Sequence, residues 1–266
     1  MRQWIRGLVG AMMLGALVPA TADGQGLPVD LELVLAVDVS GSMDPEEQRL
    51  QRAGYVAALV HPEVLAAIRT GAYGRIAVTY VEWAGAAIQN VTIPWRVIED
   101  PASAEDFVAE LDDLPFARHR GTSISGALQF AGGLFQDNGF ESWRQVIDVS
   151  GDGPNNMGVP VVPVRDALVE QGIVINGLPI TIDRSARGFA SISNLDVYYQ
   201  DCVIGGPGAF MIPIDTHDQF VEATRRKLVL EIAGRPPLLL PASQHAETPR
   251  IDCMIGERLR RSWMEQ

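Results

Sequence analysis

The chain has 266 residues and a formal net charge of −12, from 21 Lys and Arg against 33 Asp and Glu. Its hydrophobic fraction of 47% is enough for a sizeable core and argues against global disorder. The acidity argues against a general nucleic-acid or anionic-membrane binder. Two cysteines are too few for a disulfide-rich miniature scaffold or a zinc site built from cysteines alone.

The first 22 residues have the composition of a secretory signal peptide. Met1–Arg6 carries two arginines and no acidic residue, Leu8–Leu17 is apolar, and Ala20 and Ala22 form a cleavage pattern of small residues. We therefore expect cleavage after Ala22 and a secreted or periplasmic protein, the alternative being an uncleaved N-terminal anchor. No later apolar run reaches about 18 residues, so no membrane span is expected after cleavage.

Downstream of the leader, apolar runs typical of strands alternate with segments of helical periodicity. The run Leu31–Asp38 is almost entirely apolar, as expected of a strand buried on both faces. A helix follows, with Asp44 as N-cap, Pro45 in the first turn and Glu47 completing a capping box. Further strands are expected at residues 75–83, 87–93, 144–150, 172–182 and 209–214, and further helices from residue 103 and at 124–135, 164–171, 194–201 and 215–233.

This alternation predicts an α/β domain with helices on both faces of a parallel sheet. We assign residues 29–234 to this domain, because Gly234 and the prolines after it end the last helix. Residues 235–266 then form a linker and a C-terminal tail. In sheets of this kind ligands bind at the carboxyl ends of the strands.

Three loops of the predicted domain carry oxygen ligands. Asp38, Ser40 and Ser42 follow the first strand, Thr122 lies just before a helix, and Asp152 follows the strand at 144–150. Carboxylate and hydroxyl oxygens suit Mg²⁺, Ca²⁺ or Mn²⁺ rather than zinc or copper, and Mg²⁺ is the first choice. Two carboxylates neutralise a divalent ion but leave it short of about six ligands. The open positions suit water or an acidic group of a partner.

The order Asp38-x-Ser40-x-Ser42, Thr122, Asp152 resembles the metal-ion-dependent adhesion site (MIDAS) of von Willebrand factor A (vWA) domains. The resemblance implies a three-layer, doubly wound, Rossmann-like α/β fold, whose mostly parallel sheet has about six strands and one antiparallel edge strand. It also implies that the serines and the threonine coordinate the ion, while the aspartates bind it directly or through water. The segments SGDGPNN and RIDCMIGE are similar to a secreted bacterial vWA-type family of unknown function, which names no ligand.

Each of these residues also has a plainer interpretation. Asp38 and Asp152 could close turns beside glycine, Ser40 and Ser42 could simply precede a helix, and Thr122 could be an N-cap. The coincidence of all of them in three loops favours the metal site.

Two groups beside the predicted site are ambiguous. Asn155 and Asn156 either border the ligand surface or form a turn. Arg118, His119 and Arg120 either help to hold an acidic partner or lie in a solvated loop.

An enzymatic interpretation agrees less well with the residues. The Gly-Thr-Ser at 121–123 resembles the nucleophile tripeptide of subtilisin-like proteases, and His61 or His119 lies between Asp38 and it. His61, however, is followed by Pro62, and neither histidine has the sequence context of that family. We therefore expect no catalytic site. A metal-assisted hydrolase with His119 as base is the remaining enzymatic alternative.

The two cysteines are predicted to pair. Cys202 ends the short helix at 194–201, and Cys253 lies beyond the linker. The signal peptide implies an oxidising compartment, where paired cysteines persist. A Cys202–Cys253 disulfide would tether the tail to the domain, whereas the alternative is two reduced cysteines in the core.

The main hypothesis is a secreted vWA-type protein that uses a divalent cation to engage an acidic group of a protein partner. The alternative is a structural or assembly subunit in which the metal only orders the loops. Neither hypothesis involves nucleic acid, and the sequence leaves the oligomeric state open.

Overall fold

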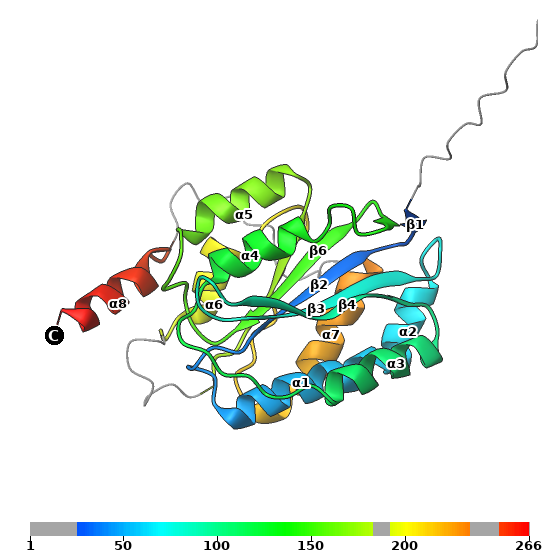
Figure 1. Cartoon of the computed structure of the whole chain (residues 1–266), viewed down its shortest axis with the longest axis horizontal. Helices are drawn as coiled ribbons and strands as arrows, with labels where there is room; N and C mark the ends of the chain where they lie inside the picture. The colour runs from blue at the N-terminus through cyan, green and yellow to red at the C-terminus, as the bar shows by residue number, and fades with distance from the viewer. Residues whose placement is uncertain (1–25, 183–191, 235–249, 266) are drawn as a thin grey trace, which may run out of the picture.

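The computed structural model describes residues 26–182, 192–234 and 250–265. The predicted signal peptide and the linker at 235–249 lie outside these residues. Within them, the central sheet has five strands in the order β4-β3-β2-β6-β7 (Figure 1). These strands are β2 (Glu32–Asp38), β3 (Ile76–Trp83), β4 (Gln89–Ile98), β6 (Gln145–Gly151) and β7 (Val174–Pro179). The short strands β1 (Leu27–Pro28) and β5 (Phe140–Glu141) pair separately.

The orientation of the strands confirms a mostly parallel sheet with an antiparallel edge. β2, β3, β6 and β7 run parallel, and β4 pairs antiparallel with β3 at one edge. The strand expected at 209–214 is instead a segment joined to β7 by isolated bridges, so the described sheet falls short of about six strands. Gly177 and Thr181 donate to the carbonyls of Phe210 and Ile214, but Pro179 between them has no backbone N–H to donate, which interrupts the pairing at this edge.

Helices cover both faces of the sheet, as expected of a doubly wound fold (Figure 1). One face carries α1 (Pro45–Leu59), α2 (Pro62–Arg69), α3 (Pro101–Asp112) and α7 (Phe220–Ala233), and the other carries α4 (Ile124–Gly133), α5 (Val161–Glu170) and α6 (Leu195–Tyr198). A π-helix (Tyr199–Val203) continues α6, a 3₁₀ turn (His217–Gln219) precedes α7, and α8 (Ile255–Met264) lies at the C-terminus. Successive residues of β2 point into opposite layers: Leu33 and Leu35 into the first, Val34 and Ala36 into the second.

Capping residues set the ends of the helices. Asp44 caps α1 and forms the predicted capping box with Glu47. α3 begins two residues before Ser103, because Asp100 is its N-cap and Ser103 is the capping-box partner. Gly234 ends α7 in the left-handed conformation, at φ 62°, where glycine has no Cβ to clash.

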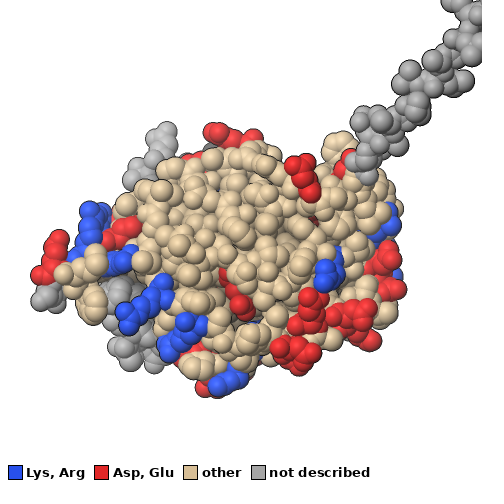
Figure 2. All heavy atoms as spheres, in the orientation of Figure 1, with Lys and Arg blue, Asp and Glu red and all other residues tan. Residues whose placement is uncertain are grey.

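The surface is unevenly charged. In Figure 2, acidic side chains gather toward the end of the molecule that carries α2 and α3, and basic side chains are frequent toward the end that carries α8. Within the described ranges, no helix combines the length and the apolar character needed to cross a membrane.

Candidate metal centre

The carboxyl ends of β2 and β6 bring two of the predicted loops together. The two strands are parallel neighbours, with Val37 opposite Ser150, so Asp38 and Asp152 leave the same edge of the sheet. Ser42 Oγ donates a hydrogen bond of 2.6 Å to Asp152 Oδ1, which joins the first loop to the third.

The hydroxyls and the carboxylates form one hydrogen-bonded group. Ser40 Oγ lies 2.8 Å from Ser42 Oγ, and the backbone N–H of Ser40 donates to Asp38 Oδ1 at 2.6 Å. Four of the predicted ligands, Asp38, Ser40, Ser42 and Asp152, are therefore in one cluster. Such an arrangement offers a cation only oxygen donors.

Burial gives this cluster an unusual electrostatic state. Asp38 and Asp152 are both completely buried. Burial raises the pKa of Asp38 well above its ordinary value, the charge of Asp152 raises it further, and hydrogen bonds from Ser40 oppose the rise. Within the described part of the chain, Asp38 Oδ2 has no hydrogen-bond partner. A buried, unsatisfied carboxylate oxygen beside a second carboxylate fits a site for a cation.

Thr122, the fifth predicted ligand, is held by the segment that follows Asp152. Its backbone N–H donates to Asn156 Oδ1 at 3.0 Å, and its carbonyl accepts from the N–H groups of Asn156 and Met157 at 2.8 and 3.2 Å. Thr122 is buried. The second predicted loop is thus fastened to the segment that begins four residues after Asp152.

The basic loop before Thr122 braces the first loop. His119 forms an isolated parallel bridge with Ser40, and its N–H donates to the carbonyl of Val39 at 3.0 Å. Arg118 donates from its guanidinium to the carbonyl of Gly41 at 2.6 Å. The side chains of this loop are exposed, so it both holds the first loop and places positive charge beside it.

The residues of the protease-like interpretation serve as helix caps. Ser123 is buried, and its hydroxyl accepts from the N–H of Gly126 at the start of α4. His61 caps α2, a helix that the sequence did not predict, with its Nδ1 accepting from Glu63 N at 3.2 Å. The hydroxyl of Ser123 and the imidazole of His61 are thus each engaged in capping a helix.

The structural role of Asn155 and Asn156 could not be chosen from the sequence. Asn155 is completely buried, and its Oδ1 accepts from the N–H of Ser125 at 3.0 Å. Its Nδ2 donates to the carbonyl of Val159 and to Glu257 Oε1 of α8, at 3.1 and 2.7 Å. The two asparagines therefore connect loops instead of merely forming a turn. The only signal in the sequence is their position directly after the third metal loop.

A second buried ionic cluster lies where β6 faces α7. Lys227 of α7 is fully buried, with Nζ 2.5 Å from Asp148 Oδ1 and in contact with Glu231. Burial raises the pKa of Asp148, and Lys227 opposes the rise. Burial and the charge of Asp148 raise the pKa of Glu231 to about 7. Asp148 is thus a structural residue that fastens α7 to the sheet.

The described residues contain no group of three or more His, Cys, Asp or Glu side chains that could hold a metal ion. The cluster at the carboxyl edge is of a different kind, because it combines two carboxylates with hydroxyl groups. A site with two carboxylates and several hydroxyls offers a hard cation fewer charged ligands than a site of three or more carboxylates. Some coordination positions of the cation then stay open.

The mostly parallel sheet with its antiparallel edge and the helices on both faces give the chain the fold of vWA domains. The chain belongs to the family described as "protein of unknown function (DUF1194)", whose sequence model matches residues 28–236. Among curated proteins, none matches the chain.

Several solved structures share the fold at low sequence identity. A von Willebrand factor type A protein from Catenulispora acidiphila is 15% identical, with a TM-score of 0.52 over 77% of this chain and 43% of its own. Proximal thread matrix protein 1 from the mussel byssus, with a zinc-occupied MIDAS motif, is 13% identical, with a TM-score of 0.51 over 80% and 47%. The pilus adhesin SpaC from Lactobacillus rhamnosus GG is 12% identical, with a TM-score of 0.54 over 78% and 31%. The chain spans less than half the length of each.

Proposed function

We propose that this protein is an exported vWA-type binding protein whose residues Asp38, Ser40, Ser42, Thr122 and Asp152 hold a divalent cation, Mg²⁺ first. The observation that carries the proposal is the buried carboxylate pair, in which one oxygen of Asp38 has no hydrogen-bond partner in the described part of the chain. Two buried like charges are costly unless a cation neutralises them. The bound ion supplies a positive charge to which a carboxylate of a protein partner can bind.

The exposure of the five proposed ligands indicates the side from which a partner would approach the cation. Ser42 alone among the five proposed ligands is not buried, so a partner would approach over the first loop. The exposed Arg118 and Arg120 lie in the loop that braces it. Although the chain as a whole is acidic, an acidic partner would meet positive charge here, which favours association.

Two further observations support the proposal. The mussel thread protein, which shares the fold, has a zinc-occupied MIDAS motif, and SpaC is a pilus adhesin. The leader of residues 1–22 supports export and a secreted or periplasmic location. The family carries no assigned activity, so the proposal depends mainly on the chain's own cluster.

Calorimetric titration of the exported protein with Mg²⁺, Ca²⁺ and Mn²⁺ tests the metal site. We expect saturable binding that Asp38→Asn weakens by at least about tenfold, as loss of a ligand should. Asp44→Asn is the matched control, because it removes the same charge near the site and keeps a capping side chain on α1. Equal affinities in all three proteins, or no saturable binding by wild type, would refute the metal site. Intact mass of the same sample reports whether cleavage follows Ala22.

The position for a partner can be tested with acetate as a minimal carboxylate. Mn²⁺ bound to the protein relaxes the protons of its water ligands, and acetate should reduce this effect by displacing water. An unchanged relaxation rate at saturating acetate would contradict carboxylate binding. Pull-downs with and without EDTA then separate the two non-enzymatic hypotheses, because a partner retained in EDTA favours a subunit whose metal only orders the loops.

A further inference from the structure

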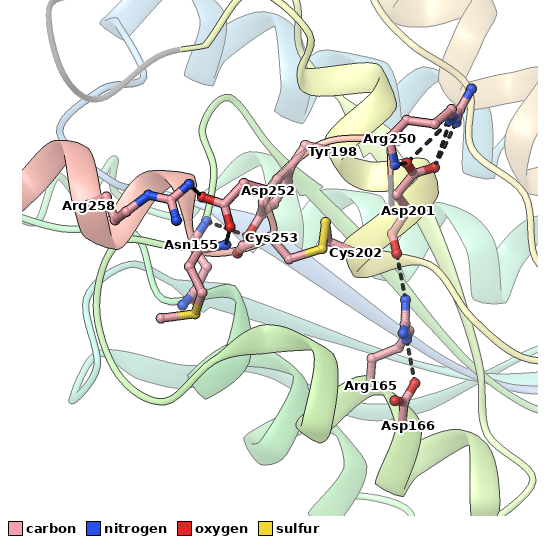
Figure 3. Close-up of a disulfide and its surroundings, with 11 residues drawn as sticks. Asn155, Arg165, Asp166, Tyr198, Asp201, Cys202, Arg250, Asp252, Cys253 and Arg258 are labelled. Carbon is pink, nitrogen blue, oxygen red and sulfur yellow. Dashed lines mark hydrogen bonds and ion pairs between the residues drawn. A yellow bond between two sulfur atoms is a disulfide. The ribbon is translucent and has the colours of Figure 1, made fainter. Parts of the chain in front are cut away.

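The C-terminal tail, residues 250–265, is fastened beside the metal cluster. A disulfide joins Cys253 to Cys202 of the π-helix, with the two Cα atoms 5.5 Å apart (Figure 3). Arg250 pairs with Asp201 at 2.7 Å next to it. α8 begins directly after this anchor at Ile255. Within α8 only Gly256 is buried, so its position depends on the anchor and on a few specific contacts.

Those contacts converge on the segment that follows Asp152. Gly256 packs so closely on the carbonyl of Asn155 that a Cβ at this position would overlap it. Glu257 Oε1 accepts from Asn155 Nδ2 at 2.7 Å, and Arg260 Nη1 donates to the carbonyl of Asn156 at 3.3 Å. Side chains of α8 in the tail therefore hold both asparagines in place.

Tyr198 connects the same segment to the disulfide. Its hydroxyl accepts from the N–H of Asn155 at 3.2 Å and donates to the carbonyl of Cys253 at 3.4 Å. In Figure 3 the Tyr198 and Asn155 side chains lie beside the disulfide. The anchor and the asparagine segment thus share a buried hydroxyl.

The two asparagines in turn hold the second metal loop. Asn156 binds both backbone groups of Thr122, and Asn155 Oδ1 accepts from the N–H of Ser125. Asp152 precedes them by three and four residues. A continuous series of hydrogen bonds therefore runs from the tail, through Asn155 and Asn156, to Thr122.

We propose that the disulfide-anchored tail is a brace of the cation site, in which Asn155, Asn156, Glu257 and Arg260 are positioning residues for Thr122. The inference rests on the proposed function and adds a means of regulation to it. A dithiol reductant, itself oxidised to a disulfide, converts the Cys202–Cys253 bond to two thiols; this releases the tail, loosens the Thr122 loop and lowers the affinity for the cation. Cation binding then depends on the redox state of the compartment.

A matched pair of arginine variants separates this brace from simple electrostatics. Arg260 contacts Asn156, whereas Arg261 is its exposed neighbour. Removal of a positive charge near a cation site should, by electrostatics alone, strengthen cation binding in both Arg260→Gln and Arg261→Gln. The brace predicts weaker Mn²⁺ binding in Arg260→Gln only, by about threefold or more. If Arg260→Gln bound Mn²⁺ as tightly as wild type, or more tightly, the proposal would be overturned.

Glu257 allows a rescue test. Glu257→Ala removes the acceptor for Asn155 Nδ2, whereas Glu257→Gln removes only the charge and keeps an acceptor oxygen. We expect Glu257→Ala to weaken Mn²⁺ binding by at least about tenfold and Glu257→Gln to restore most of the loss. Amide hydrogen exchange over residues 122–126 should quicken in the alanine variant without any metal present. Equal exchange and equal affinity in the two variants would contradict the brace.

The disulfide itself is tested in the wild-type protein, with near-UV circular dichroism as a control of folding. Reduction with dithiothreitol should raise the Kd for Mn²⁺, and reoxidation should reverse the change. If wild type binds Mn²⁺ in an Asp38-dependent manner and neither reduction nor the tail variants change the Kd, the brace is wrong while the metal site stands. If wild type binds no Mn²⁺, the proposed function fails first.

Discussion

Glu231 gives the buried cluster beneath α7 a measurable pH dependence. Its carboxylate contacts Lys227 and accepts a hydrogen bond of 2.9 Å from Asn176, and its pKa rises from 4.5 to about 7 through burial and the charge of Asp148. In the unfolded chain it titrates near the ordinary value, so the folded state binds the proton more tightly. The stability contributed by protonated Glu231 is complete below about pH 4.5 and is lost as the pH rises through about 7.

The substitution Glu231→Gln removes this titration and keeps an oxygen that can accept from Asn176. A pKa difference of this size corresponds to on the order of 3 kcal/mol. We therefore expect the free energy of unfolding of the variant, relative to wild type, to rise by on the order of 3 kcal/mol between about pH 4 and about pH 8.

Urea denaturation at a series of pH values, with the disulfide intact, measures this difference. Other groups titrate in both proteins, so most of their contributions cancel. Glu222→Gln is the control: Glu222 is an exposed residue of the same helix, paired with Arg225, and its variant should follow the wild-type profile. Parallel profiles for wild type and Glu231→Gln would refute the raised pKa of the buried carboxylate.

Three further outcomes follow from capping, cross-linking and ligation. Asp44→Ala removes the N-cap of α1 and should lower the free energy of unfolding by about 1 kcal/mol in urea denaturation, whereas Asp44→Asn should change it little. Replacement of Cys202 and Cys253 by serine opens a loop with a sequence separation of 51 and should cost on the order of 4 kcal/mol; a loss below about 1 kcal/mol would contradict a stabilising role of the bond. Mg²⁺ at about 100 times its wild-type Kd should stabilise wild type by about 2.7 kcal/mol and Asp38→Asn, with its Kd raised at least about tenfold, by no more than about 1.4 kcal/mol, as thermal denaturation can measure.

The elements nearest the candidate metal site were predictable because short sequence patterns, apolar runs and capping residues, determine them. The apolar run that ends at Asp38 and the strand that ends before Asp152 are buried on both faces, and parallel strands bring their carboxyl ends to one edge. The capping box at Asp44 fixes the start of α1 a short distance beyond the first loop. Each of these signals lies within a few residues of the group it positions.

The contacts that escaped prediction join residues far apart in the sequence. Asn155 and Glu257 are 102 residues apart, and only the path of the tail brings them together. Lys227 lies in α7, and a lysine in a surface helix ordinarily faces solvent, so its burial could not be predicted. Asp148 is a carboxylate inside an apolar strand, and nothing near it in the sequence identifies Lys227, 79 residues later, as its partner.

β6 illustrates two solutions to the same electrostatic problem. Asp148, within the strand, is buried on the α7 side and is neutralised by Lys227 from the same chain. Asp152, just beyond the strand, is buried beside Asp38, where the neighbouring side chains Ser40 and Ser42 provide hydroxyl oxygens instead of positive charge. The buried pair of Asp38 and Asp152, in which one oxygen of Asp38 has no hydrogen-bond partner among the described residues, favours an external cation, and Ser42 at the partly open side leaves a route for it. The internal pair of Asp148 and Lys227 holds α7 in place, whereas the proposed external cation would make the edge of the sheet a site for exchangeable ligands.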